Sequence, residues 1–257
     1  EMSKKYLGEQ IDIHAGGEDL IFPHHENEIA QSEAANGKEF SRYWMHNGFL
    51  NIDNRKMSKS LGNFFTVREI SEKYDLQVLR FFMLSAHYRS PLNFSAELME
   101  AAKSGLERII TAADRLKFLM GSAKTEDMAE TEAEKFAKSA EYVGNFESAM
   151  DDDFNTADAI AAVFDLVKFI NTMTDEDSSK EYLENLFDRL VRLTEVLGII
   201  VDKEDEILDS DIEALIAERQ AARKEKNFAR ADEIRDELLA KGIVLKDTRE
   251  GVQWKRA

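Results

Sequence analysis

The sequence predicts a mostly α-helical protein with a small α/β portion near its N-terminus and a small α+β module at its C-terminus. Three observations lead to this fold class. A strand-like run, a helix-like run and a second strand-like run follow one another over residues 11–52. Apolar residues then recur at helical spacing over residues 76–200, and a short hairpin pattern closes the chain.

The first part of the chain reads as strand, helix and strand, over residues 11–15, 22–36 and 44–52. Gly16 and Gly17 end the first strand. Pro23 is tolerated in the first turn of the helix, and Gly37 suits the position just after its end. Two strands joined by a helix are typical of a parallel sheet, but two strands are too few for a doubly wound sheet. We therefore expect only the trailing edge of such a sheet.

Helices are expected over most of the remaining chain. Pro91 breaks the pattern, Ser95 suits an N-cap, Asn155 or Thr156 suits another, and Gly198 suits a helix stop. The expected helices cover residues 67–74, 76–88, 95–120, 132–150, 157–170, 183–197, 212–226 and 229–240. Residues 243–246 and 253–255 are expected to pair as a hairpin.

Composition limits the function classes. The 257 residues include no cysteine, which excludes disulfides and thiol catalysis. We find no signal peptide and no apolar run of about 18 residues, so no membrane span and a cytoplasmic location are expected. The net charge of −17 arises from residues 121–211, and this block is expected to face away from nucleic-acid phosphates.

A basic, hydroxyl-rich run follows the second predicted strand: Lys56, Met57, Ser58, Lys59 and Ser60. Ammonium groups, serine hydroxyls and backbone amides suit a mobile loop that closes on a polyphosphate. A solvated basic turn has the same composition. The position between a strand and a helix favours the phosphate loop.

The run matches the KMSKS signature of class I aminoacyl-tRNA synthetases, and three further strings narrow the resemblance. They are residues 11–28, residues 151–157 and residues 223–236. Together they resemble cysteinyl-tRNA synthetases along essentially the whole chain. The resemblance implies a trailing part of a Rossmann-like catalytic domain over residues 1–66, a stem-contact region over 67–94, a DALR-type helical bundle over 95–202 and an anticodon-binding module over 203–257.

The resemblance implies an adenylate pocket at Gly16, Gly17 and Asp19. On their own, a double glycine and an aspartate also fit a tight turn. Lys56 and Lys59 are then the catalytic lysines, with Lys59 stabilising the transition state and the pyrophosphate. The remaining ATP contacts would come from Met57, Ser58 and Ser60. ATP with Mg²⁺ is the expected cosubstrate. His14 would lie near the substrate amino acid, although most histidines in such positions are core or turn residues.

The resemblance also implies a zinc site. His24 and Glu28 lie four residues apart, so a helix would place both on one face, as it would any exposed pair. They match two of the family's four zinc ligands, and the other two are cysteines, which this chain lacks. The HIGH motif is missing too. We expect a chain that lacks the N-terminal half of the family's fold, is inactive alone and binds zinc weakly or not at all.

The expected reaction is ligation of L-cysteine to tRNA(Cys). Basic and aromatic residues near the C-terminus suit single-stranded RNA, and the resemblance assigns anticodon contacts to Arg223, Asp232, Asp247 and Trp254. A solvated helical hairpin with a core tryptophan is the plainer interpretation. Two alternative functions are a synthetase-like ligase that joins cysteine to an aminosugar and a non-catalytic tRNA-binding module. The oligomeric state does not follow from the sequence, although the uncovered sheet edge suggests pairing with a second copy.

Overall fold

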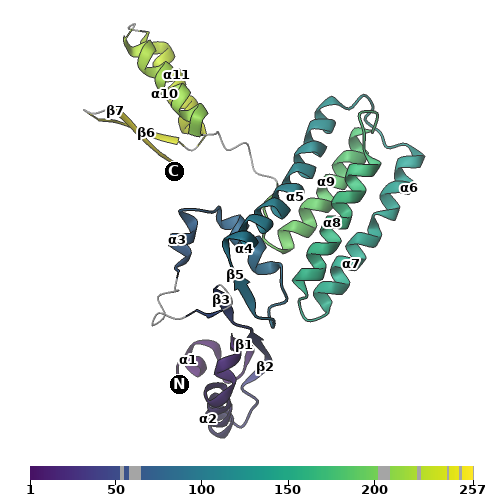
Figure 1. The fold of residues 1–257 in the computed structure, drawn as a ribbon, viewed down its shortest axis with the longest axis vertical. Coiled ribbons are helices and arrows are strands. Elements are labelled where there is room, and N and C mark those ends of the chain that lie inside the picture. Colours follow the sequence, from purple (N-terminus) through teal and green to yellow (C-terminus); the bar gives the residue numbers. More distant parts are fainter. Residues whose placement is uncertain are drawn as a thin grey trace. The chain divides into compact units, whose positions relative to one another are not determined.

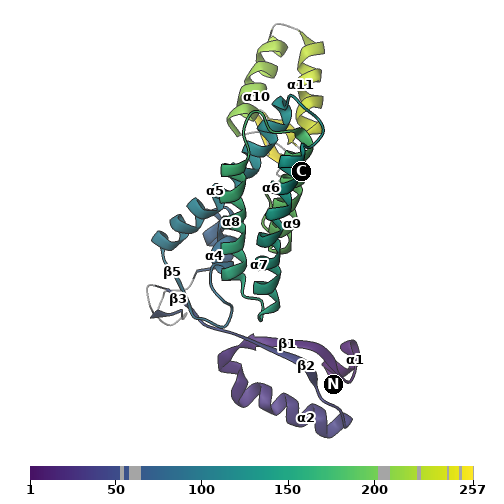
Figure 2. The ribbon, with the colours of Figure 1, turned by 90° about the vertical axis from the view of Figure 1, so that its right-hand side faces the viewer.

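A computed structural model describes residues 1–52, 55–57, 65–201, 209–224, 227–241, 243–248 and 251–256. The chain divides into two compact units, Glu1–Asp202 and Lys203–Ala257. Figure 1 and Figure 2 show the elements of both units. Helices dominate, as predicted. Within the described residues no helix combines the length and apolarity needed to cross a bilayer.

The first sheet contains two parallel strands, β1 (Ile11–Gly17) and β2 (Ser41–Asn47), with α2 (Glu26–Asn36) between them in sequence. The predicted strand–helix–strand order is confirmed, and Gly37 ends α2 in the left-handed conformation. The helix begins later than predicted, because Phe22 has extended φ and ψ angles. Irregular helical turns cover residues 18–25, and a short helix, α1 (Met2–Leu7), precedes β1.

The predicted single strand over residues 44–52 was wrong, because Gly48 and Phe49 belong to no strand. The backbone of Ser90 and Pro91 approaches Gly48 so closely that a Cβ atom there would lie 2.6 Å from the carbonyl carbon of Ser90. After this break, β3 (Leu50–Ile52) belongs to a different sheet from β2. The contacts at the break come from a segment about 40 residues away, so the local pattern could not reveal it.

The second sheet has the order β4-β3-β5, with β4 (Arg55–Lys56) antiparallel and β5 (Leu92–Phe94) parallel to β3. Two helices, α3 (Val67–Ser71) and α4 (Leu76–Leu84), connect β4 to β5. The predicted helix over residues 76–88 ends four residues early. The three-residue β5 is too short for a periodic pattern.

Five helices then form a bundle: α5 (Ala96–Ser122), α6 (Glu130–Lys138), α7 (Ala140–Asp151), α8 (Thr156–Met173) and α9 (Lys180–Val196). The predicted caps are confirmed, because Ser95 accepts a hydrogen bond from the amide of Leu98 and Asn155 accepts one from the amide of Asp158. The helix predicted over residues 132–150 is two helices that meet at Ser139. There Arg189 of α9 donates to the Ser139 hydroxyl, a contact between distant residues.

The second unit contains a helical hairpin, α10 (Asp209–Lys224) and α11 (Phe228–Ala240), followed by an antiparallel pair, β6 (Ile243–Thr248) and β7 (Gly251–Arg256). Its small core is formed by Ile216, Ile234, Leu238 and Ile243. The predicted helices and hairpin are confirmed, and α10 begins three residues before the predicted start.

Candidate functional site

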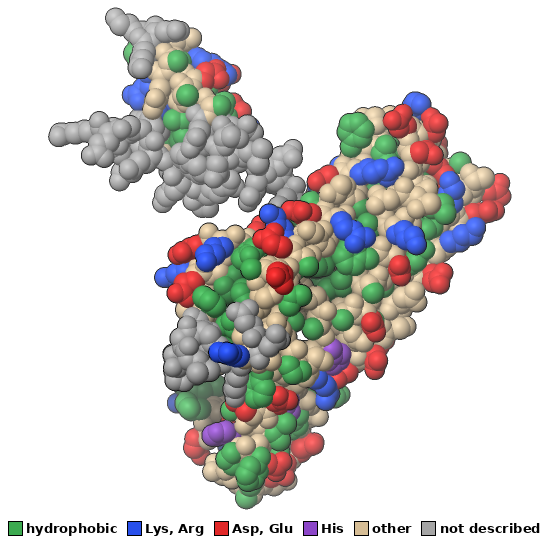
Figure 3. Space-filling view, viewed as in Figure 1, with side chains coloured by type: hydrophobic (Ala, Val, Ile, Leu, Met, Phe, Trp, Pro, Cys, Tyr) green, Lys and Arg blue, Asp and Glu red, His purple; other side chains and the backbone are tan. Residues whose placement is uncertain are grey.

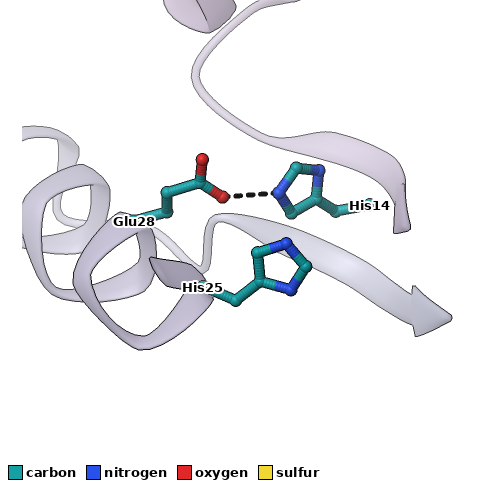
Figure 4. Close-up of side chains that lie close together, drawn as sticks. All are labelled: His14, His25 and Glu28. Atoms are coloured by element: carbon teal, nitrogen blue, oxygen red, sulfur yellow. Dashed lines mark hydrogen bonds and ion pairs between the residues drawn. The ribbon is translucent and has the colours of Figure 1, made fainter. Parts of the chain in front are cut away.

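Histidines gather where the two strands of the first sheet meet the start of α2 (Figure 4). His14 lies on β1, and its Nε2 atom is 2.5 Å from Oε2 of Glu28 on α2. His25 lies in the turn before α2, and its Nδ1 atom is 2.8 Å from Nε2 of His46 on β2. The His14 and His25 rings are 4.8 Å apart. Three segments of the chain therefore place imidazole and carboxylate groups within one small region.

Glycines make room for this arrangement. A Cβ atom at Gly16 would lie 2.9 Å from Cε1 of His25 and 2.9 Å from a methyl carbon of Leu20. A Cβ atom at Gly17 would lie 2.5 Å from Oδ1 of Asp19. A side chain at Gly16 would therefore push His25 out of its place. The double glycine continues β1 instead of ending it, so both residues pair with β2 at its carboxyl end.

The buried position of His25 affects its charge. Burial lowers the pKa of His25 below its ordinary value, and the neighbouring His14 lowers it further. A neutral imidazole is favoured, and this is the form that can donate a lone pair to a metal ion. Desolvation disfavours the charged form because the low-dielectric surroundings do not solvate it.

His14, His25 and Glu28 form a donor set that suits a metal ion. One ligand atom from each lies within 4.8 Å of the others. Imidazole nitrogen and carboxylate oxygen are common zinc ligands, and a three-ligand set leaves one position open. Glu28 belongs to this donor set, and its predicted role as a zinc ligand stays a prediction. The predicted partner His24 is exposed and is not part of this group.

The structure describes only the start of the basic loop over residues 56–60. The backbone of Lys56 pairs with Asn51 in the second sheet, and Met57 is half-buried. Ser58, Lys59 and Ser60 lie outside the described residues. The predicted catalytic role of the two lysines stays a prediction.

The four predicted anticodon residues are divided between the helices and strands of the second unit. Arg223 on α10 and Asp232 on α11 are both exposed. Asp247 lies in β6 opposite Val252, and Trp254 lies in β7 opposite Leu245. Their roles as RNA contacts stay predictions. Near them, Arg230 donates to Glu218 at 3.0 Å and to Glu233 at 2.7 Å.

Sequence reasoning missed His25 and His46 as members of the histidine group. A usable signal was present, because Trp44 and His46 lie two residues apart in β2 and therefore point to the same face of the strand. His14 pairs with Trp44 in the parallel register, which brings that face of β2 next to His14. Only the irregular turn before α2, which the sequence presented as regular helix, places His25 between them.

Comparison with known proteins first defines the class. Residues 1–104 match the family model described as "tRNA synthetases class I (C) catalytic domain". This match assigns the N-terminal part of the chain to the catalytic domains of class I aminoacyl-tRNA synthetases.

The remaining matches define the family. Residues 145–201 match the DALR domain, and residues 205–254 match the "Cysteinyl-tRNA ligase anticodon binding domain". The chain is 69% identical over 256 residues to cysteine–tRNA ligase of Lachnospira eligens. It is 58% identical over 262 residues to cysteine–tRNA ligase of Lachnoclostridium phytofermentans. The chain belongs to the cysteinyl-tRNA synthetase family.

These alignments include 100% of this chain but only 54% and 56% of the two relatives. Solved structures support the fold alone. The LeuRS of Agrobacterium radiobacter K84, solved with tRNA and LeuAMS, matches 76% of this chain and 28% of its own, with a TM-score of 0.60 and 19% identity. Mycobacterium tuberculosis methionyl-tRNA synthetase bound by methionyl-adenylate matches 73% of this chain and 41% of its own, with a TM-score of 0.55 and 20% identity.

Proposed function

We propose that the complete protein containing this chain ligates L-cysteine to tRNA(Cys) through a cysteinyl-adenylate, with ATP and Mg²⁺ as cosubstrate. The observation that carries this proposal is the 69% identity to a cysteine–tRNA ligase along the whole chain. The match of residues 205–254 to an anticodon-binding domain favours tRNA over an aminosugar as the acceptor. The match of residues 1–104 to a catalytic domain favours an enzyme over a non-catalytic RNA-binding module.

In this proposal the nucleotide lies at the carboxyl ends of β1 and β2, where parallel sheets bind ligands. Gly16 and Gly17 let the adenylate approach the backbone, and Asp19 accepts hydrogen bonds from ribose hydroxyls. His14 faces the amino acid. Lys56 and Lys59 stabilise the negative charge that develops on the phosphates, and Ser58 and Ser60 add hydrogen bonds. Catalysis is then mostly positioning and charge stabilisation.

Glu28 is the proposed ligand of a zinc ion that would bind the substrate thiolate and so distinguish cysteine from serine. The resemblance pairs Glu28 with His24, whereas the geometry pairs it with His14 and His25. We expect zinc to bind this chain weakly, because it supplies no cysteine. Titration of the chain with zinc decides between the two sets. Both ligand sets predict that E28Q lowers the affinity for zinc. Loss of zinc affinity in H24A would identify His24 as the partner of Glu28, and loss in H25A would identify His25.

The second unit is the proposed anticodon reader. Arg223 would contact phosphate or base, Asp232 and Asp247 would accept from base amino groups, and Trp254 would stack on a base. Both signs of charge are interspersed on the face of the bundle visible in Figure 3. Specificity would depend on the contacts of the four residues of the second unit with the anticodon bases. Substitution of the anticodon should weaken tRNA binding to the wild-type chain, and D232N should reduce that discrimination.

The central experiment compares cysteine-dependent ATP–pyrophosphate exchange in the complete wild-type protein with the K59A variant. Loss of one preorganised charge from a transition state lowers the rate by roughly 10²–10³-fold, and we expect that loss for K59A. K38A is the matched control, because Lys38 is an exposed lysine that pairs with Glu9. Wild-type protein that exchanges pyrophosphate with another amino acid but not with cysteine would overturn the proposal.

A further inference from the structure

Two segments that the nucleotide site does not use meet in the structure. They are residues 87–89, after α4, and the turn between α7 and α8. The Tyr88 hydroxyl donates to Oδ1 of Asp153 at 2.8 Å, and Nε of Arg89 donates to Oδ2 at 2.5 Å. Nε2 of His87 lies 3.9 Å from the same carboxylate. We call Tyr88, Arg89 and Asp153 the Asp153 clamp.

The turn that presents Asp153 is strained. Asp153 and Phe154 have φ angles of 57° and 55°, the left-handed region that non-glycine residues rarely adopt. The turn is closed by two backbone bonds of 3.1 Å, from Phe154 to Met150 and from Asn155 to Ala149. These bonds hold the backbone at Asp153, and Tyr88 and Arg89 hold its carboxylate.

The exposed ion pair alone does not explain this arrangement. The left-handed region is unfavourable for a non-glycine residue. The side chains of Asp153 and Arg89 are 40% and 61% exposed, and water screens such a pair. Strained residues of this kind concentrate at functional positions.

The other side of the clamp touches the connection between the two sheets. The amide of Gly48 donates to the carbonyl oxygen of Tyr88 at 2.8 Å. Gly48 follows Asn47, the last residue of β2, which pairs with Gly17 of β1. It precedes β3, which pairs with the strand that contains Lys56. Tyr88 thus contacts the α7–α8 turn through its hydroxyl and the connection between β2 and β3 through its backbone.

We propose that Asp153 is a positioning residue that fixes the helical bundle against the β2–β3 connection during transfer of the amino acid to tRNA. This inference rests on the proposed function. The proposed activation step uses groups within residues 14–60, whereas transfer requires an RNA held along the rest of the protein to reach them. The Asp153 clamp is one point at which the bundle is tied, through Tyr88, to the β2–β3 connection.

The test compares two activities of the complete protein and its D153A variant. We expect cysteine-dependent ATP–pyrophosphate exchange to stay within about 2-fold of wild type. We expect kcat/KM for tRNA charging to fall roughly 10–100-fold, because misplacement of a reacting group by about 1 Å can lower a rate by about 100-fold. R89A should lower charging as well, and the double variant R89A/D153A should be no worse than D153A. D152A is the matched control, since Asp152 is the exposed neighbour of Asp153, and it should behave as wild type.

Equal loss of both activities in D153A would overturn the inference, because it would show that the clamp only stabilises the fold. Unchanged tRNA charging in D153A would overturn it as well. Amide hydrogen exchange tests the contact between the Asp153 clamp and Gly48 without depending on the reaction that the protein catalyses. D153A should speed amide exchange of the 257-residue chain at Gly48, and D152A should not. Unchanged exchange at Gly48 would contradict the proposed link. A wild-type protein that activates cysteine but charges no tRNA would overturn the proposed function, with the exchange result still deciding the clamp.

Discussion

Glu132 at the start of α6 offers a sharp test of how the bundle is held together. Its side chain is 8% exposed. One carboxylate oxygen accepts from the amide of Ser179 at 2.9 Å, and the other accepts from the Ser179 hydroxyl at 2.6 Å and the Ala129 amide at 3.0 Å. A single buried carboxylate therefore joins the beginnings of α6 and α9.

Replacement of Glu132 by Gln removes the charge and one acceptor oxygen. In one amide orientation the NH₂ group faces the buried backbone N–H group of Ser179. In the other it faces the N–H group of Ala129, an exposed residue. An unpaired buried donor costs about 1–3 kcal/mol, and the remaining bonds lose charge assistance, which adds about 1 kcal/mol. We expect E132Q to lower the free energy of unfolding by about 2–4 kcal/mol. For a unit of about 200 residues this lowers Tm by roughly 5–12 °C.

The effect depends on pH. Burial raises the pKa of Glu132, but hydrogen bonds from Ser179 and Ala129 outweigh burial, so its pKa lies below the ordinary value of 4.5. The stabilisation is therefore complete above pH 4.5 and is lost as the pH falls through the folded-state pKa. The difference in Tm between wild type and E132Q should shrink over that acidic range.

Calorimetry of the full chain at pH 7 and in acid measures both effects on the transition of the first unit. E130Q is the control, because Glu130 is exposed on the same turn of α6, and its Tm should differ little from that of wild type. A difference between E132Q and wild type below 1 °C at pH 7 would refute the reasoning. So would a difference that stays constant down to pH 3.

Three further predictions concern packing and ionisation. L186A should lower the free energy of unfolding by about 3–5 kcal/mol in denaturant titration, because Leu186 is fully buried; a loss below 1 kcal/mol would contradict this. G48A should cost about 1–3 kcal/mol because its Cβ atom would overlap Ser90, whereas G144A, at an open helical site, should be neutral or stabilising. The Tyr182 hydroxyl is buried without a hydrogen-bond partner among the described residues, so Y182F should be at least as stable as wild type at pH 7. Burial raises the pKa of Tyr182 to about 12, so wild type should lose stability from pH 10 towards 12, and melts that fall equally in Y182F would count against that assignment.

Sequence reasoning predicted the α/β start, the helical bundle and the C-terminal hairpin, because each depends on local periodicity and caps. Ser95 and Asn155 cap their helices as predicted, since a side-chain oxygen two or three residues from an amide needs no tertiary partner. The family motifs also carried the resemblance on their own. These features lie within short windows of chain.

Tertiary structure decided the features that depend on distant contacts. Gly48 divides a strand-like run because the backbone at Ser90 lies against it. His25 joins His14 and Glu28 because an irregular turn precedes α2. Asp153 meets Tyr88 and Arg89 across more than 60 residues of chain. The sequence by itself determined most of the helices, the C-terminal hairpin and the family resemblance, because these depend on short windows of chain. Only close packing of remote segments decided where β2 and β3 separate and which side chains share a site.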